Sequence, residues 1–185
     1  MKRWIPLVLM VGLCGCHTFM KVKPDYADLP VDTLREVARE IEQIVHEGNR
    51  DFTIADRDGV VVNTEPVLHA IRTRAARAHL VEGFLETGHA WERQSGLLDV
   101  IRSREYKKFG TSRDRDRNAL VVLGENTDRW AIYEGIIDAG NFRAKSLSAI
   151  QEIFFEERLA FLPEGVKYES ETGEVAFVGG SPTAP

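Results

Sequence analysis

Cysteine is nearly absent from this sequence of 185 residues. The only two are Cys14 and Cys16, and none follows residue 16. A structural zinc site uses about four ligands at characteristic spacing, so cysteines cannot build one in the folded part. A disulfide between Cys14 and Cys16 would close a strained ring around one intervening residue. The folded part must therefore rest on its hydrophobic core.

Long hydrophobic runs are also missing. The longest, from Trp4 to Cys14, has eleven residues and is interrupted by a proline and a glycine. A membrane-spanning helix needs about 20 apolar residues. Lys2 and Arg3 precede the run, and a short apolar run after a positive start is typical of a secretory signal peptide. The sequence therefore predicts export of the chain.

The stretch Leu13-Cys14-Gly15-Cys16 at the end of this run resembles the lipobox of bacterial lipoproteins, in which an aliphatic and two small residues precede an obligatory cysteine. The resemblance implies that the Cys16 thiol receives a diacylglyceryl group, that cleavage follows Gly15, and that the new amino terminus is acylated. Each buried methylene contributes about 0.8 kcal/mol, so two or three chains anchor durably. His17 follows where an aspartate would favour inner-membrane retention. We expect a periplasm-facing lipoprotein, with the outer membrane favoured.

Basic residues are fewer than acidic ones, with 24 Lys and Arg against 29 Asp and Glu. Removal of residues 1–15 takes away Lys2 and Arg3, so the balance becomes 22 minus 29, or -7. Such a chain lacks the clustered cations that neutralise nucleic-acid phosphates. We expect no nucleic-acid partner and a membrane contact through acylated Cys16. Other envelope proteins and lipid remain the open candidates for further partners.

Common catalytic motifs are missing as well. The sequence contains no GxSxG elbow, no His-Glu-x-x-His pair and no glycine-rich phosphate loop, so we expect neither an enzyme nor a cofactor. The strongest candidate for catalytic or metal-binding chemistry is the stretch HLVEGFLETGH, in which His79, Glu82, Glu86 and His89 follow one another at spacings of three, four and three. Glu86 and His89 have the spacing found in di-iron bundles, which need two such motifs. These four residues are weak candidates for a metal site or a metal-dependent or hydrolytic enzyme; the alternative is a solvated acidic face.

Helical periodicity dominates the middle of the chain. Apolar residues recur at spacings of three and four from Asp32 to Gly48, from about residue 65 to 86, from 113 to 139, and from Ser146 to Pro163. Asp32, Ser112 and Ser146 are the expected N-caps. Two β-prone runs flank residues 171–173 and predict a hairpin, and residues 52–62 fit either a hairpin or an irregular loop. The predicted fold class is mainly α: a small domain of four or so helices with one or two minor β-hairpins.

These elements predict a domain organisation. Residues 1–15 are the signal peptide, 16–31 a lipidated tether, 32–178 a single helical domain, and 179–185 a disordered tail. Residues 89–110 give no readable pattern. The stripe of the helix over 65–86 includes a charged residue, Arg74, among alanine, valine and isoleucine. In the helix over 113–139 the expected stripe is Ala119, Val122, Leu123, Asn126, Trp130, Tyr133 and Ile137.

Aromatic residues gather in the last two predicted helices. Phe154 and Phe155 are adjacent, so one helix cannot point both at the same core; one should line a groove, contact the hairpin or be exposed. Exposed aromatic side chains mark partner or lipid sites, and Trp130, Tyr133 and Phe155 are the candidates for such a surface. Core packing is the alternative. Asn126 and Arg129 are polar residues on this apolar stripe, and such residues commonly hydrogen-bond to a neighbouring loop backbone.

Two segments, ENTDRWAIYEGIIDAGN from Glu125 to Asn141 and SLSAIQEIFFEERLAFLPEG from Ser146 to Gly165, resemble the YdbL-like family of exported bacterial proteins. The shared features are Asn126, Arg129 and Tyr133 in one helix, a Gly-Asn break, a second helix and a glycine after it. The resemblance covers about residues 80–168. It implies an envelope location, a small and mostly helical domain, and an accessory role in envelope maintenance or lipid homeostasis. It implies no catalytic residue.

Overall fold

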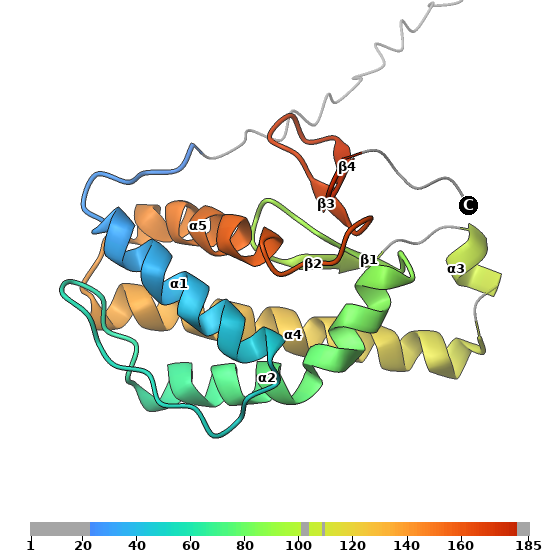
Figure 1. The fold of residues 1–185 in the computed structure, drawn as a ribbon, viewed down its shortest axis with the longest axis horizontal. Coiled ribbons are helices and arrows are strands. Elements are labelled where there is room, and N and C mark those ends of the chain that lie inside the picture. Colours follow the sequence, from blue (N-terminus) through green and yellow to red (C-terminus); the bar gives the residue numbers. More distant parts are fainter. Residues whose placement is uncertain (1–22, 101–103, 109, 181–185) are drawn as a thin grey trace, which may run out of the picture.

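The computed structural model describes residues 23–100, 104–108 and 110–180, so the signal peptide, the lipobox with Cys16, and residues 181–185 lie outside the described residues. The order of the elements is α1 (Val31–His46), α2 (Glu65–Glu86), β1 (Ala90–Glu92), β2 (Leu98–Val100), α3 (Arg104–Lys108), α4 (Ser112–Ala139), the 3-10 turn η1 (Ala144–Ser146), α5 (Leu147–Leu159), β3 (Lys167–Glu169) and β4 (Val175–Phe177). The fold is mainly α with a small sheet, as predicted (Figure 1).

Four helices form the body of the protein. Helix α1 packs against α2 and α5, and α2 packs along α4. Their interior is a single apolar core in which Leu34, Ile41, Ile71, Ile136 and Phe154 have no exposed surface. The predicted stripe of α1 is buried over its whole length, and Gly48 ends the helix with a φ of +63°. The helices over 31–46 and 65–86 thus begin and end within about two residues of the predicted bounds.

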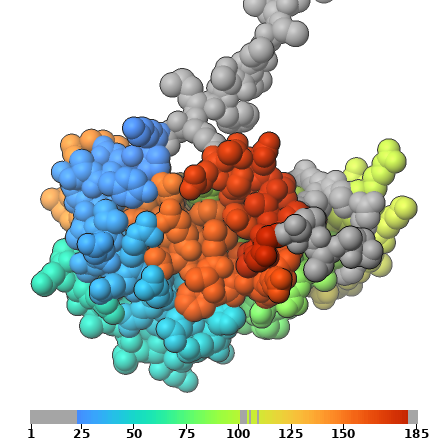
Figure 2. All heavy atoms as spheres, turned by 45° about the horizontal axis from the view of Figure 1, so that its top comes forward, coloured from blue at the N-terminus to red at the C-terminus, as the bar shows by residue number. Residues whose placement is uncertain are grey.

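The four strands form one sheet in the order β2-β1-β3-β4. Strands β1 and β2 are antiparallel, as are β3 and β4, and β1 pairs in parallel with β3 through Glu92 and Tyr168. The hairpin around residues 171–173 is confirmed, and residues 52–62 form an irregular loop with one bridge, between Arg57 and Val60. On one face of the molecule α1, α5 and the β3–β4 hairpin lie side by side (Figure 2).

The buried face of α4 differs from the predicted stripe. Ala119 is exposed, and the side chain of Leu123 is 62 % exposed. The face that enters the interior is Asn118, Val122, Glu125, Arg129, Ile132, Tyr133 and Ile136. Val122 and Tyr133 are therefore buried as predicted, whereas Ala119 and Leu123 are not. The stripe was partly wrong because it left out Glu125, a charged residue that occupies an interior position here.

The predicted helix caps were also partly wrong. Helix α4 is capped by Thr111, whose hydroxyl accepts from the Asp114 amide while the Asp114 carboxylate accepts from the Thr111 amide. Ser112 is instead the first helical residue. The Ser146 side chain makes no cap hydrogen bond, and Asp32 lies in the first turn of α1 after Pro30. These errors moved helix starts by only one or two residues.

The segment before α1 lies against the end of the domain that carries α5. Tyr26 Oη donates to Glu152 of α5 at 2.6 Å, and Asp25 and Asp28 form ion pairs with Lys145 and Arg143. Part of the segment that we expected to be a tether, residues 25–30, therefore contacts the folded domain. Among the described residues no helix is both long enough and apolar enough to cross a membrane.

Candidate functional site

Six charged side chains meet in the centre of the helical body, and we call them the charged cluster. Its members come from α1, α2, β1, α4 and α5, and each is at most 5 % exposed: Glu42, Arg74, Glu92, Glu125, Arg129 and Arg158. Three carboxylates oppose three guanidinium groups, so the formal charge of the cluster is zero. Burying a charge costs free energy unless the charge is paired and hydrogen-bonded. Each of these six groups therefore needs hydrogen-bond partners within the protein.

Glu42 accepts hydrogen bonds from two arginines. Arg74 donates to its two carboxylate oxygens at 3.0 and 2.9 Å, and Arg158 donates to the same two oxygens at 3.0 and 3.1 Å. Four charge-assisted hydrogen bonds use the full accepting capacity of one carboxylate. Glu42 thereby joins α1 to both α2 and α5.

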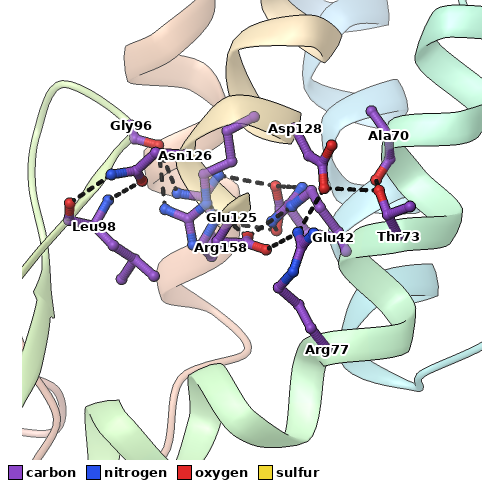
Figure 3. Close-up of polar contacts among 12 residues, drawn as sticks. Glu42, Ala70, Thr73, Arg77, Gly96, Leu98, Glu125, Asn126, Asp128 and Arg158 are labelled. Carbon is purple, nitrogen blue, oxygen red and sulfur yellow. Dashed lines mark hydrogen bonds and ion pairs between the residues drawn. The ribbon is translucent and has the colours of Figure 1, made fainter. Parts of the chain in front are cut away.

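Arg129 links the helices to the sheet. It donates to both Glu92 oxygens at 2.8 and 2.9 Å and to Glu125 at 2.8 Å. The Gly96 carbonyl, in the β1–β2 loop, accepts from Arg129, Arg158 and the Tyr133 hydroxyl at 3.2, 3.3 and 2.9 Å. The loop is thus held by three side chains from two helices. Figure 3 shows Gly96 close to Arg158.

Other polar contacts extend the charged cluster toward the surface. Arg77 donates to Asp128 at 2.5 Å, and the same Asp128 oxygen accepts from Thr73 at 2.7 Å. At the other side, the Asn126 amide pairs with the backbone N–H and C=O of Leu98 at 2.8 and 2.9 Å (Figure 3). This confirms the expectation that Asn126 bonds to a neighbouring backbone, and it holds strand β2 against α4.

Two carboxyl groups of the charged cluster, Glu42 and Glu125, have strongly lowered pKa values. Burial by itself would raise the pKa of Glu42, but the charges of Arg158 and Arg74 outweigh it and lower the pKa to about 2. The pKa of Glu125 is likewise lowered, because Arg74 and Arg129 outweigh the effect of its burial. Both groups stay ionised at neutral pH, so neither is tuned to act as a general acid or base there.

A small cavity of about 70 Å³ lies over the charged cluster, which forms its floor. Its walls are apolar and come from α1, α2 and the segment after α5: Val45, Ala78, Val81, Leu85, Phe161, Leu162 and Pro163. His46 and Glu82 also line it. This volume holds several water molecules or the polar head of a small ligand. A charged floor under apolar walls suits a ligand with a polar group at one end and an apolar body.

The four candidates for a metal site do not converge. Glu82 lines the cavity over the charged cluster, whereas His79 and His89 line a different hollow, and Glu86 is exposed. In the part of the chain that the structure describes, no group of three or more His, Cys, Asp or Glu side chains is placed to hold a metal ion. Gly88, with a φ of +67°, ends α2 before His89 and turns the chain away.

The proposed aromatic surface does not form either. Tyr133 has no exposed surface and Phe155 is 5 % exposed, so neither side chain is available to a partner. Phe154 packs on Tyr133 in the helical core, with ring centroids 5.2 Å apart, and Phe155 faces Tyr168 of the hairpin at 6.4 Å. Trp130 is half-buried. The alternative of core packing is therefore the one observed: Phe155 is buried where α5 packs on Tyr168 of the β3–β4 hairpin.

Sequence reasoning missed the charged cluster, although one signal was present. Arg74 was on the apolar stripe of its predicted helix, and a charged residue in such a position needs a buried partner. Its partners lie 32 and 51 residues away in the sequence, so no local pattern identifies them. Glu92 lies in the stretch that gave no readable pattern at all.

The chain was compared with protein families, curated proteins and solved structures. No protein-family model, curated protein or solved structure matches the chain.

Proposed function

We propose that this chain is a lipid-anchored envelope protein whose domain is a non-catalytic accessory or binding factor in envelope maintenance or lipid homeostasis. The anchor is the acylated Cys16, on the periplasmic side of a membrane, with the outer membrane favoured. The sequence Leu13-Cys14-Gly15-Cys16 after a short apolar run supports the anchor. The resemblance of residues 80–168 to the YdbL-like family supports the accessory role.

The cavity over the charged cluster is the observation that most directly supports a binding role. With a volume of about 70 Å³ it admits a polar head at its charged floor and only the adjoining part of an apolar body between its walls. The members of the charged cluster are hydrogen-bonded to one another, and Glu42 and Glu125 remain ionised at neutral pH, so the cluster suits recognition better than proton transfer. We therefore assign the binding of a small amphiphilic ligand to this cavity.

The anchor also limits where this cavity can work. Seven peptide links join Cys16 to Lys23, the first described residue, and they reach at most about 25 Å. The next residues are held against the folded domain, where Tyr26 bonds to Glu152 of α5 and Asp25 pairs with Lys145 of η1. In the proposed arrangement the domain stays within a few tens of Å of the bilayer surface.

Two pairs of variants test this proposal. Cys16→Ser should release the protein from the membrane fraction or leave it unprocessed, whereas Cys14→Ala should change neither. For the cavity, Ala78→Leu fills the wall, and Ala76→Leu adds the same side chain at an exposed position of the same helix. Native mass spectrometry of protein extracted from envelopes should find a bound small molecule with Ala76→Leu and lose it with Ala78→Leu. Equal retention in both variants, or no bound molecule in the parent protein, would count against the binding role.

A further inference from the structure

The end of the domain that carries α3 and the start of α4 has a charge opposite in sign to that of the chain. Residues 104–117 contain six Lys and Arg against three Asp and Glu, a net charge of +3, whereas the whole chain has a net charge of -5. We call α3 together with residues 110–123 the basic lobe; it lies at the end of the molecule away from α1 (Figure 1). The acidic balance of the whole chain therefore does not hold at this end.

The positive charge of the basic lobe is open to solvent. Lys107, Lys108 and Arg113 are exposed, and none of them forms an ion pair with a side chain that the structure describes. The side chain of Arg117 is 76 % exposed and lies 3.7 Å from Asp114. An exposed ion pair is weak in water, so Asp114 does not withdraw Arg117 from other anions. These four cations are therefore available to an anionic partner.

Helix α3 is fixed to the rest of the domain, so its cations keep their place beside those of α4. Tyr106 of α3 is buried, and its ring packs against the ring of His89 with centroids 5.3 Å apart. Arg115 of α4 donates to the backbone carbonyls of Lys107 and Gly110, both at 3.1 Å. The cations of the two helices thus form one surface.

Exposed leucines continue this surface along α4. Arg113, Arg117 and Leu120 follow at spacings of four and three, which places them on one face of the helix. Leu120 is 67 % exposed and Leu123 is 62 % exposed. Leu80 of α2 is also exposed, and it lines the same hollow as Arg117. Large apolar side chains that gather at the surface mark an interaction site, so the basic lobe offers a partner both charge and apolar area.

Cations beside exposed leucines suit the surface of a bilayer that contains anionic phospholipid. Its outer groups are phosphates, which attract Lys and Arg, and its acyl chains begin just beneath, where leucines can be buried. Nucleic acid offers phosphates but no apolar layer for the leucines. A second copy of the chain would place the cations of two basic lobes against each other, and like charges repel. Charge and apolar surface together therefore favour a lipid surface.

We propose that the basic lobe docks on anionic phospholipid headgroups and thereby orients the domain on the bilayer. This inference rests on the proposed anchor at Cys16, which brings the domain to a membrane but does not select the face that meets it. In the docked state the cations contact the phosphates, and Leu120 and Leu123 enter the headgroup layer beside them.

The test uses the mature chain with vesicles of phosphatidylcholine, either alone or mixed with the anionic phosphatidylglycerol. A short pulse of acetylation, read by mass spectrometry, reports how accessible each lysine is. We expect Lys107 and Lys108 to react more slowly on vesicles that contain phosphatidylglycerol, whereas Lys145, which is exposed in η1, should react equally on both. The protection should disappear in about 1 M salt, where the Debye length falls to about 3 Å.

Matched variants locate the docking surface. Arg113→Gln combined with Arg117→Gln removes two cations of the basic lobe and keeps both reporter lysines; the ratio of docked to free domain should fall about fivefold for each arginine. Arg50→Gln combined with Arg72→Gln removes two exposed cations elsewhere and should leave this ratio unchanged. Leu120→Gln should lower the ratio as well, because it removes apolar area from the lobe. All five positions are exposed, so circular dichroism should show the parent fold in each variant.

Equal reactivity of Lys107 and Lys108 on both kinds of vesicle would overturn the proposal, and so would equal effects of the two double variants. Protection that grows with protein density on phosphatidylcholine alone would assign the basic lobe to a contact between copies and would overturn it as well. The amino-terminal peptide is read in the same spectra, so failure of the anchor is seen separately. Protected lysines in a chain without an acyl group on Cys16 would support docking and contradict the proposed function.

Discussion

Arg74 and Glu42 face each other in the centre of the protein, where both Nη atoms of the guanidinium donate to the carboxylate oxygens at 3.0 and 2.9 Å. Arg74 is 1 % exposed and Glu42 is 3 % exposed. The pair joins α1 to α2, and Arg158 brings α5 to the same carboxylate. Four of the predictions below concern this charged cluster or the glycines that shape the fold around it.

The first prediction concerns the loss of one arginine. Arg74→Met should lower the free energy of unfolding by about 3–5 kcal/mol, because it leaves buried carboxylates without their partner. Arg72→Met is the matched control in the same helix, since Arg72 is 43 % exposed and lies 3.9 Å from Glu65; it should cost less than about 1 kcal/mol. Urea unfolding followed by circular dichroism measures both. Equal stability of the two variants would show that the charged cluster does not stabilise the fold.

The second prediction concerns acid. The pKa of Glu42 is lowered from its ordinary value of 4.5 to about 2 in the folded state, so the unfolded chain binds more protons in between. Its stabilising contribution is therefore fully present above about pH 4.5 and is lost as the pH falls toward 2. Glu125 acts in the same direction. The free energy of unfolding, measured by urea titration at a series of pH values, should fall steeply through this window, and Glu42→Gln should flatten the slope. A slope that Glu42→Gln leaves unchanged would contradict the shift.

The third prediction compares two helical glycines. Gly83→Ala should stabilise the protein by about 0.5–1 kcal/mol, because α2 gains a better helix former and the new methyl group meets nothing. Gly135→Ala should destabilise it, because the added Cβ would collide with Cγ2 of Val67, and overpacking costs about 1–3 kcal/mol. Midpoints of thermal unfolding should move in opposite directions. A shift of the same sign in both would contradict the packing of α2 on α4.

The fourth prediction concerns Gly96, whose carbonyl accepts three hydrogen bonds from the helices. Its φ is +73°, and a Cβ atom would lie 2.9 Å from the Tyr133 hydroxyl oxygen and 3.0 Å from the Gln151 carbonyl oxygen. Gly48 has a similar φ of +63°, but its Cβ would make only an ordinary contact. Gly48→Ala should lower the free energy of unfolding by about 1–2 kcal/mol, because alanine is strained at a positive φ. Gly96→Ala should lower it further, by about 1–3 kcal/mol, because the added methyl group also collides with its neighbours. Urea unfolding separates the two; equal costs would mean that the β1–β2 loop is not fixed by this contact.

Much of the fold was accessible from the sequence because its signals are local. The apolar stripe of α1, the glycines at 48 and 88, and the turn at residues 171–173 each predict a helix or a hairpin from neighbouring residues. The adjacent Phe154 and Phe155 predicted that one of them lines a groove, contacts the hairpin or is exposed; in the structure Phe155 contacts the hairpin through Tyr168.

The candidate sites were less accessible because they depend on contacts between distant segments. Glu92 meets Arg129 across 37 residues, and Arg158 meets Glu42 across 116. Charged residues are normally assigned to the surface, so the predicted stripe of α4 left out Glu125, which is buried. The histidines at 79 and 89 were noticed for their spacing, but only the tertiary arrangement separates them from Glu82.

The covalent state of Cys16 tests the proposed function most directly, since the location of the domain and the membrane origin of its ligands both follow from it. Mass spectrometry of the amino-terminal peptide of protein extracted from bacterial membranes measures that state. We predict a chain that begins at Cys16 and carries a diacylglyceryl group on the thiol and an acyl chain on the amino group. A peptide that begins at Met1, or an unmodified Cys16, would contradict the lipid-anchored assignment.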